Sequence, residues 1–386
     1  MSRNKSAIYE AATLILLARS SQRASKSANN LQPRAAVFPG GMIDKADFSD
    51  DWKNIYQKEV DWLNLIESLP KTCDPRTSLY TRSRDSSLTT DIGLRISAIR
   101  ETFEESGILL LRSLTDGLPE SNSGGTFAST INISSEELNK WRVMVRENAT
   151  RFMDLCRELQ ALPDIWSLYE WNNWFTPPGF KKRFNTSFFV CCTEQMDDVS
   201  EDAREVTKTF WTPPLGVLQQ FASKKLLLFP PQNVELSRLL KYIFVNLTIV
   251  LFSQHKFYKE FLISFSSVEE VLKFSYNRAR NHPTLLHLPI LVKCKDGNMT
   301  VMPGDSLYPL DLLSLQNYEG EAPGEDAVLI NRNSETIEQV NSSSENMYRC
   351  VFHEEYSNTV NPSHDTWSTL YCNINTADGH KPPQLF

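Results

Sequence analysis

The N-terminal part of the chain combines short apolar runs with one long, strongly apolar segment. Residues 7–17 end in the run Ala11-Ala12-Thr13-Leu14-Ile15-Leu16-Leu17, which is typical of a buried strand. Ala35–Phe38 predicts a second short strand that leads into the turn Pro39-Gly40-Gly41. Residues 92–103 carry too many apolar side chains for a simple surface helix, and Gly107 is typical of a helix C-terminus.

Apolar spacing predicts several further elements. Spacings near three and four favour helix over residues 51–69, and the polar stretch 71–90 is typical of a flexible return with solvated basic side chains. Ser134 and Glu137 form a capping-box pattern, and the apolar stripe extends the helix to about Gln160. Residues 186–192 predict a strand, Pro214 begins a helix, residues 234–244 predict a closing helix, and residues 318–346 predict a mobile loop.

Three glutamates stand close together in the run Arg100-Glu101-Thr102-Phe103-Glu104-Glu105-Ser106-Gly107. On a helix they share one side, where like charges repel by a few tenths of a kcal/mol per pair. A bound divalent cation would offset that repulsion, and carboxylate oxygens suit Mg²⁺. The alternative is a solvated acidic face, which is the commoner explanation of such a turn. The apolar residues before the run favour the cation, as does the upstream glycine turn, which lets backbone approach a phosphate.

Composition describes an ordinary globular protein. The 386 residues are 41% hydrophobic and 23% charged, with a net charge of −7 that argues against bulk nucleic-acid binding. The seven cysteines include no Cys-x-x-Cys pair, which predicts reduced intracellular thiols and neither a disulfide framework nor a zinc site. Adjacent Cys191 and Cys192 should face opposite sides of a strand.

Membrane and targeting signals are weak. The apolar runs 11–18 and 242–252 are too short to span a bilayer, and the polar start Met1–Lys5 predicts no secretory signal. The last residues, Gln384-Leu385-Phe386, are not a Ser-Lys-Leu type peroxisomal address. We therefore expect no membrane partner.

The glutamate run, with Gly40-Gly41 upstream, resembles the signature of the Nudix hydrolases. That signature reads Gly, five residues, Glu, seven residues, Arg-Glu-apolar-x-Glu-Glu-x-Gly-apolar. Here a long insertion separates the two halves, and Thr102 takes the apolar position. Two residues compete for the place of the first Glu: Asp47 follows Gly41 at the usual distance, and Asp91 precedes Arg100 at nearly the usual distance.

An insertion at this point resembles the peroxisomal acyl-coenzyme A diphosphatase branch, the nucleoside diphosphate-linked moiety X motif 19 type. Two further passages resemble elements of coenzyme A-directed enzymes of the family. The first is Leu16-Leu17-Ala18-Arg19-Ser20 with Val37-Phe38-Pro39-Gly40-Gly41, and the second is Thr176-Pro177-Pro178-Gly179 with Arg183-Phe184-Asn185-Thr186-Ser187-Phe188-Phe189. The resemblance thus extends over most of residues 7–250.

The resemblance implies an α/β fold, the Nudix-type α/β/α sandwich with a mixed sheet. The Nudix domain would span residues 7–253, with a helical insertion at 47–90 inside the box. Residues 254–386 would form a C-terminal extension, either packed on the same domain or separate. The branch is peroxisomal; without a recognisable signal, cytosol or mitochondrion is the alternative compartment.

The implied activity is metal-dependent hydrolysis of the diphosphate of coenzyme A or acyl-coenzyme A, giving adenosine 3′,5′-bisphosphate and 4′-phosphopantetheine or its acyl ester. Glu101, Glu104 and Glu105 would bind Mg²⁺, or Mn²⁺, and act with Arg100 in catalysis. The expected substrate-binding residues are Gly40, Gly41, Arg19, Ser20 and Arg183.

The residues alone leave alternatives open for the substrate, the activity and the roles of single side chains. Another nucleoside diphosphate-linked compound, such as a dinucleotide, a nucleotide sugar or a capped nucleotide, would use the same chemistry. The interrupted box is also compatible with an inactive nucleotide-binding module. Arg19 is explained equally well as a solvated charge at a strand end. The aromatic residues of 166–175, beside the basic triplet Lys181-Lys182-Arg183, fit either a nucleotide contact or a core corner.

Overall fold

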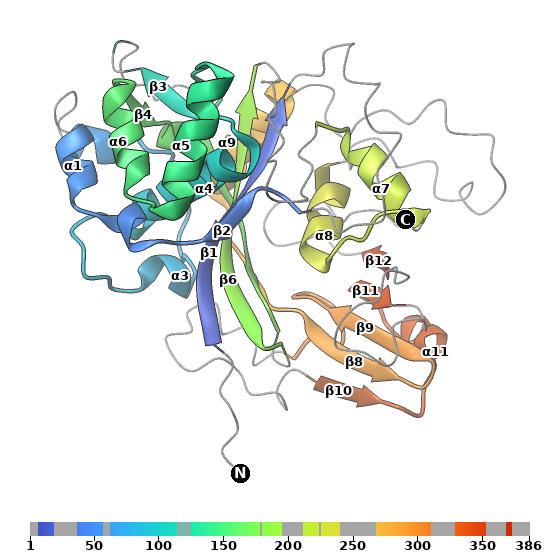
Figure 1. Cartoon of the computed structure of the whole chain (residues 1–386). Coiled ribbons are helices and arrows are strands. Elements are labelled where there is room, and N and C mark those ends of the chain that lie inside the picture. The colour runs from blue at the N-terminus through green and yellow to red at the C-terminus, as the bar shows by residue number, and fades with distance from the viewer. Residues whose placement is uncertain are drawn as a thin grey trace.

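The computed structural model of the chain describes residues 7–18, 37–56, 62–113, 115, 119, 124–177, 180–194, 211–223, 225–239, 268–309, 329–352 and 368–372. In these residues two five-stranded sheets and one two-stranded sheet are covered by helices (Figure 1). Within the same residues no helix combines the length and the apolar character needed to cross a bilayer.

The first sheet is mixed, as predicted. It contains β1 (Ala7–Ala18), β2 (Gly40–Met42), β5 (Leu168–Phe175), β6 (Lys182–Thr193) and β7 (Leu286–His287), in the order β2-β1-β6-β5-β7. Strands β1 and β6 run parallel over their whole length, whereas β2 pairs antiparallel with β1, with Gly41 opposite Ala12. Among the residues that the structure describes, the glycine pair therefore belongs to an edge strand of the sheet.

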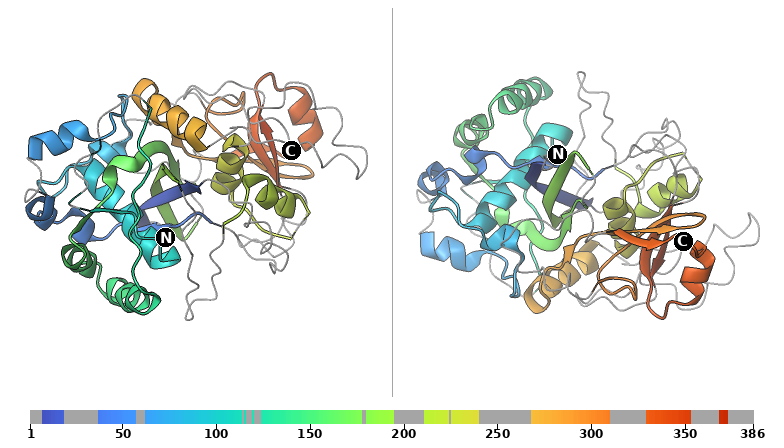
Figure 2. Two further views of the ribbon diagram at one scale, coloured as in Figure 1. Left: turned by 90° about the horizontal axis from the view of Figure 1, so that it is seen from above. Right: turned by 90° about the horizontal axis from the view of Figure 1, so that it is seen from below.

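Each face of this sheet packs against its own helices, which makes three layers (Figure 2). Ala12 and Leu14 of β1 pack on the side of α4 (Thr90–Ser106), α5 (Ser135–Glu147) and α6 (Arg151–Glu158). Ile15 packs on the side of α8 (Pro230–Leu239) and α9 (Val268–Asn281). Cys191 and Cys192 lie in opposite clusters, as the alternation of a strand requires.

The insertion packs against the first sheet and α4. It contains η3 (Lys45–Phe48), α1 (Asp51–Tyr56), α2 (Trp62–Ser68) and α3 (Ser78–Thr81). The expectation that its basic residues are solvated is wrong for Arg76 and Arg84. Arg76 is paired with Asp91 and Glu170, and Arg84 with Glu10, and both guanidinium-bearing side chains are mostly buried.

Smaller elements complete the first unit. Strands β3 (Leu111–Ser113) and β4 (Ala161–Pro163) pair antiparallel, η5 (Ile165–Ser167) follows β4, and α7 (Pro214–Ala222) begins at the predicted proline. The predicted closing helix over residues 234–244 corresponds to α8, which ends at Leu239; residues 240–244 lie outside the described part.

The second sheet follows β7 in the chain. It contains β8 (Ile290–Cys294), β9 (Gly297–Val301), β10 (Leu329–Arg332), β11 (Tyr348–Phe352) and β12 (Ser368–Cys372), with α11 (Ile337–Ser342) packed on it. Phe175 and Leu286 of the first sheet share a core cluster with this sheet. The predicted extension thus supplies α9 and β7 to the layers of the first sheet and then forms a sheet of its own.

Three expectations about local structure need correction. The helix predicted to Gln160 is broken between α5 and α6, because the Asn148 side chain accepts hydrogen bonds from the Thr150 amide and hydroxyl. Residues 37 and 38 are not strand; the strand is displaced to the glycines, where it pairs with β1. The predicted mobile loop contains β10 and α11, the latter with its own capping box at Thr336.

Candidate active site

The predicted glutamate run forms the C-terminal turns of α4. The helix ends at Ser106, and Gly107 adopts the left-handed conformation at φ 79°, which glycine accepts without strain. Thr102 stands at the position where an apolar residue is usual and is fully buried. Its hydroxyl donates to the Ala98 carbonyl at 2.7 Å, so the polar group is satisfied inside the helix.

The glycine strand lies directly against the glutamates, although the insertion separates them in sequence. The Gly40 amide donates to a carboxylate oxygen of Glu105 at 3.0 Å. A Cβ added at Gly41 would lie 2.4 Å from a carboxylate oxygen of Glu101, and one at Gly40 would lie 2.5 Å from the Ala12 carbonyl. A side chain at Gly40 would therefore collide with the backbone of β1, whereas one at Gly41 would displace the carboxylate of Glu101.

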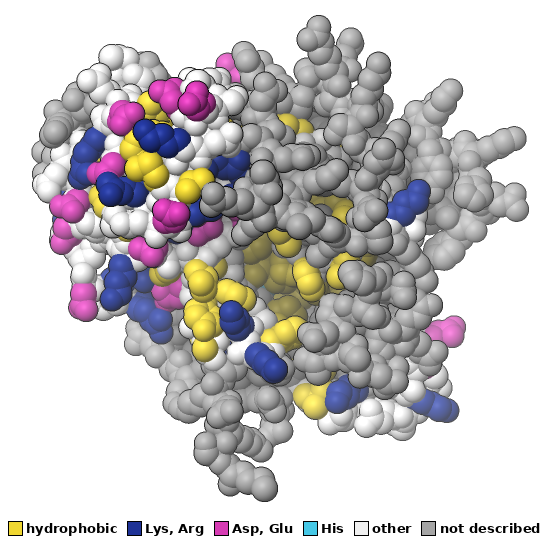
Figure 3. Space-filling view, viewed as in Figure 1, with side chains coloured by type: hydrophobic (Ala, Val, Ile, Leu, Met, Phe, Trp, Pro, Cys, Tyr) yellow, Lys and Arg dark blue, Asp and Glu magenta, His cyan; other side chains and the backbone are white. Residues whose placement is uncertain are grey.

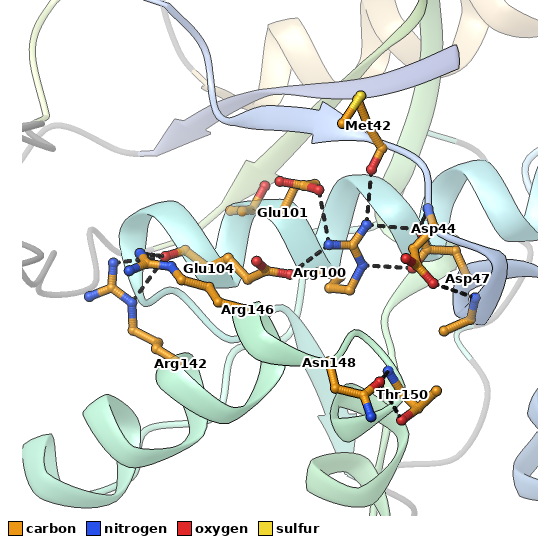
Figure 4. Close-up of polar contacts among 12 residues, drawn as sticks. Met42, Asp44, Asp47, Arg100, Glu101, Glu104, Arg142, Arg146, Asn148 and Thr150 are labelled. Atoms are coloured by element: carbon orange, nitrogen blue, oxygen red, sulfur yellow. Dashed lines mark hydrogen bonds and ion pairs between the residues drawn. The ribbon is translucent and has the colours of Figure 1, made fainter. Parts of the chain in front are cut away.

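Arg100 is the centre of the carboxylate cluster (Figure 4). Its guanidinium makes a bidentate pair with Asp47, at 2.7 and 2.9 Å, and donates to Glu101 at 2.9 Å and to Glu104 at 2.6 Å. It also donates to the Met42 carbonyl at 3.2 Å, which fixes β2 to the helix. The bidentate partner of Arg100 is therefore Asp47, while Glu101 and Glu104 each receive a single hydrogen bond from it.

Of the two acidic residues that compete for the first place in the box, Asp47 is the one that contacts Arg100. Its carboxylate also accepts the Asp44 amide at 2.8 Å, and the side chain is 1% exposed. Asp91, the competing candidate, contacts Arg95 at 3.1 Å and Arg76 at 3.0 Å. The residue spaced after Gly41 thus lies in the carboxylate cluster, whereas the residue spaced before Arg100 belongs to a different ion pair.

Electrostatics within the cluster disfavour full ionisation of its carboxyls. Burial raises the pKa of Glu101 to about 7; Arg100 opposes the shift and the neighbouring carboxylate of Glu104 adds to it. Burial likewise raises the pKa of Glu104 against the pull of Arg100. Three carboxylates thus contact one guanidinium, and an additional positive charge would favour their ionised forms.

Two arginines from α5 hold the C-terminus of α4. Arg142 donates to the Glu104 carbonyl at 2.9 Å and to the Glu105 carbonyl at 2.9 Å, and Arg146 also donates to the Glu104 carbonyl. Cations at the last carbonyls of a helix stabilise the helix and hold the backbone from which its last side chains project. The sequence pattern did not predict these contacts, because Arg142 and Arg146 are indistinguishable there from other polar residues of an amphipathic helix.

The remaining predicted site residues lie elsewhere or outside the described part. Arg183 is buried near the start of β6, opposite Ile8 of β1; it donates to the Thr176 carbonyl at 2.9 Å and stacks its guanidinium over Phe175. Ile8 stands four residues before Ala12, the partner of Gly41, which is about 13 Å along a strand. Arg19 and Ser20 lie outside the described residues.

The donor set fits a divalent cation in its chemistry. Carboxylates of Glu101 and Glu105 meet at the glycine strand, and hard cations such as Mg²⁺ prefer oxygen ligands. Across the described ranges, no three His, Cys, Asp or Glu side chains are placed so that they could hold a metal ion. Glu101 and Glu104 each place one oxygen on Arg100.

A glycine edge strand against a glutamate-bearing helix defines the Nudix class, and comparison with known proteins agrees. The NUDT19 Nudix domain matches residues 4–239, so the chain belongs to this family. The acyl-coenzyme A diphosphatase NUDT19 of Xenopus laevis is 34% identical over 80% of this chain and 73% of its own length. Its human counterpart is 32% identical over 79% of this chain and 74% of its own length.

A more distant likeness reaches a bacterial structure. A NUDIX hydrolase from Alicyclobacillus acidocaldarius, solved by crystallography, superposes with a TM-score of 0.42 at 20% sequence identity, over 61% of this chain and 91% of that chain.

Proposed function

We propose that this Nudix hydrolase cleaves the diphosphate of coenzyme A or acyl-coenzyme A in a cation-dependent reaction. Water attacks one phosphorus, the bridging P–O bond breaks, and the products are adenosine 3′,5′-bisphosphate and 4′-phosphopantetheine or its acyl ester. The single observation that carries the hydrolase reading is the contact of Gly40 and Gly41 with Glu105 and Glu101. The curated relatives named acyl-coenzyme A diphosphatases support the substrate class.

Each residue of the site has a distinct part in this proposal. Glu101 and Glu105 would hold Mg²⁺ or Mn²⁺, with Glu104 as a further ligand. When bound, the cation supplies positive charge against the phosphate oxygens and makes water more acidic. One of these carboxylates accepts the proton of the attacking water. Arg100 orients Glu101 and Glu104 while Asp47 holds Arg100, which is a positioning role.

The glycine strand supplies the surface on which a phosphate can approach. Because neither glycine has a side chain, the backbone of β2 lies directly against Glu101 and Glu105, the Gly40 amide is hydrogen-bonded to Glu105, and the outer edge of β2 is left for a ligand. In the described sheet β2 is the edge strand beside β1, so one of its sides carries no neighbouring strand. Amides on such an edge can bind anions.

The test is a screen of diphosphates with the purified full chain. Coenzyme A, acyl-coenzyme A, a dinucleotide, a nucleotide sugar and a capped RNA are incubated with Mg²⁺ or with EDTA, and products are identified by mass spectrometry. We expect cation-dependent release of adenosine bisphosphate from the coenzyme A compounds. The Glu105→Gln variant should lose this activity, and Glu136→Gln, an exposed glutamate of α5, should keep it.

Two results would overturn the proposal. Faster turnover of a dinucleotide, nucleotide sugar or capped RNA would keep the hydrolase and replace its substrate. Tight binding of coenzyme A without turnover, with either cation, would mean that the site holds a nucleotide and does not cleave it.

A further inference from the structure

Two guanidinium groups from α5 meet at the end of the glutamate-bearing helix (Figure 4). The Glu104 carbonyl accepts two N–H groups of Arg142, at 2.9 and 3.2 Å, and a further one from Arg146. Arg142 also donates to the Glu105 carbonyl at 2.9 Å. The Glu105 carboxylate in turn accepts the Gly40 amide, so both arginines contact the backbone that carries the candidate active site.

Capping of α4 requires only one of these two arginines. A carbonyl oxygen offers two lone pairs, and the two N–H groups of Arg142 already occupy those of Glu104. A second guanidinium on the same oxygen brings two like charges close together, and like charges repel. An anion bound beside the two guanidinium groups would offset this repulsion.

Arg142 and Arg146 differ in their access to solvent. Arg142 is 3% exposed, whereas Arg146, one turn further along α5, is half-buried. A guanidinium carries five N–H donors, which is more than a single carbonyl can use, and its planar fork matches the oxygens of a phosphate. The buried Arg142 is therefore suited to support the helix, and the half-buried Arg146 is suited to contact a ligand.

The surrounding surface does not attract anions in general. Figure 3 shows Lys and Arg side chains interspersed with Asp and Glu side chains over the helical layer at the upper left, which contains α5 and α6. Glu136 and Glu137 begin α5, and exposed Glu147 directly follows Arg146. Because the charges of this layer are mixed, anion binding there depends on specific arginines and not on a broad basic field.

Charge and position together identify the anion. In the proposed function the diphosphate lies at Gly40 and Gly41, where a bound cation meets its charge. Coenzyme A carries one further phosphate, on the 3′-oxygen of the ribose to which the diphosphate is attached, so this phosphate lies close to the diphosphate. Arg146 contacts the residue next to Glu105 and is therefore at a suitable place to receive it.

We propose that Arg146 binds the 3′-phosphate of coenzyme A and so favours coenzyme A compounds over their 3′-dephospho forms. This inference rests on the proposed function, because it assumes that the diphosphate of coenzyme A lies at the glycine strand. Charge-assisted hydrogen bonds join the guanidinium to the phosphate, whose negative charge also offsets the repulsion between Arg146 and Arg142. Arg146 determines specificity and takes no part in breaking the P–O bond.

The experiment measures selectivity for the 3′-phosphate. The ratio of kcat/KM for coenzyme A to that for 3′-dephospho-coenzyme A is determined in Mg²⁺ for the wild type, Arg146→Gln, Arg146→Lys and Lys140→Gln. We expect the ratio to fall about tenfold or more in Arg146→Gln, because hydrogen bonds to charged groups contribute this much. Arg146→Lys keeps the charge without the fork, so its ratio should be intermediate. Lys140, an exposed residue of the same helix, is the matched control and should leave the ratio unchanged.

A binding measurement gives a readout independent of turnover. Calorimetry compares adenosine 3′,5′-bisphosphate with adenosine 5′-monophosphate, which lacks the 3′-phosphate. The wild type should bind the bisphosphate about tenfold or more tightly than the monophosphate, and Arg146→Gln should lose this difference. If Arg146→Gln does not fold, Arg146→Lys provides the test, since it should show a smaller difference than the wild type.

The outcomes separate this inference from the proposed function. If coenzyme A is cleaved and the ratio in folded Arg146→Gln equals that of the wild type, Arg146 does not bind the 3′-phosphate and the diphosphatase stands. Equal losses with both substrates would overturn the inference in the same way, because they would mean that Arg146 supports α4 or contacts the diphosphate. If the wild type cleaves neither compound, both proposals fail together.

Discussion

Glutamates occupy opposite faces of the same sheet in two very different settings. On the side of α8, the fully buried Glu235 accepts hydrogen bonds from Trp171, Asn172 and Trp174, each at 2.7 Å, and Arg238 lies 3.5 Å away. Both oxygens are satisfied by the protein itself. A buried carboxylate whose oxygens are both hydrogen-bonded within the protein has a structural role.

On the side of α4, carboxylates outnumber the positively charged groups that contact them. Asp47, Glu101 and Glu104 share the guanidinium of Arg100, and Glu105 is bonded to the Gly40 amide. The pKa of Glu101 and that of Glu104 are raised, so negative charge is held there at a cost in free energy.

The difference teaches how to tell a structural glutamate from a functional one. Glu235, Glu101 and Glu104 are all buried or half-buried, and each contacts an arginine, so neither burial nor an ion pair distinguishes them. The supply of donors does: Glu235 receives three hydrogen bonds, whereas Glu101 and Glu104 are contacted by one guanidinium that they share with Asp47, which accepts the Asp44 amide as well. A surplus of carboxylates at the edge of a sheet is where a cation and its anionic ligand are expected to bind.

The strongest test of this comparison replaces one glutamate by glutamine on each face of the sheet. Glu105→Gln should lower kcat/KM for coenzyme A by about a thousandfold, or about 4 kcal/mol, with little change in stability, because Glu105 is exposed and its proposed work is to hold the cation. Glu235→Gln should destabilise the fold by roughly 2 kcal/mol, since an amide cannot accept on both sides. Steady-state kinetics and urea unfolding measure the two effects.

Activity per folded molecule serves as the control for this pair. Folded Glu235→Gln protein should turn over at close to the wild-type rate. A thousandfold loss in Glu235→Gln, or full activity in Glu105→Gln, would show that the assignment of structural and functional glutamates is inverted.

The second prediction uses the pKa of Glu101. In the cation-free protein this pKa is about 7, against 4.5 for the ordinary carboxyl. As pH rises from about 4.5 to about 7, the unfolded chain loses its proton before the folded one, so stability falls with pH. The loss reaches about 3 kcal/mol and then stays constant.

Glu101→Gln removes this titration. In EDTA, its free energy of unfolding relative to the wild type should therefore rise between about pH 4.5 and about pH 8, by up to about 3 kcal/mol. Chemical denaturation at the two pH values measures the change. A difference independent of pH would mean that Glu101 is ionised throughout and that Arg100 neutralises it.

The third prediction separates Asp47 from Asp91. Asp47→Asn breaks the bidentate pair that holds Arg100, so we expect kcat/KM to fall by roughly tenfold to a hundredfold and cation affinity to weaken. Stability should change by about 1 to 2 kcal/mol only, because Arg100 keeps Glu101 and Glu104 as partners.

Asp91→Asn is the matched control, since Asp91 pairs with Arg76 and Arg95 and not with the cluster. Its kcat/KM in Mg²⁺ should stay within a few-fold of the wild type. Equal losses in both variants would mean that the effect of Asp47→Asn is a general weakening of α4.

Asp47 and Asp91 also show how much of the site can be predicted from the sequence. The order Glu101, Glu104, Glu105 and Gly107 on one helix is a local pattern, and the structure reproduces it without change. Asp47 and Asp91 both stood near an expected spacing, and the sequence could not choose between them. The choice depends on how the insertion brings Asp47 back to Arg100, which is a contact between residues far apart in the chain.

Errors in the fold have the same origin. Glycines predict a turn, yet Gly40 and Gly41 form a strand because β1 and Glu105 offer their amides and carbonyls partners. Apolar periodicity runs through Asn148, whereas its side chain ends one helix and starts the next. In both places specific hydrogen-bonding partners override the average tendency of the residues.

The smallest expected effect concerns the end of the box helix. Arg142 binds the Glu104 and Glu105 carbonyls with two parts of one guanidinium, which a lysine cannot reproduce. Arg142→Lys keeps the charge and should cost about 1 kcal/mol of stability, with kcat/KM lower by a few-fold because Glu105 is held less firmly. Arg157→Lys, at an exposed pair with Asp154 on α6, is the matched control and should change neither quantity. A wild-type rate in Arg142→Lys at reduced stability would mean that Arg142 supports the helix without positioning Glu105.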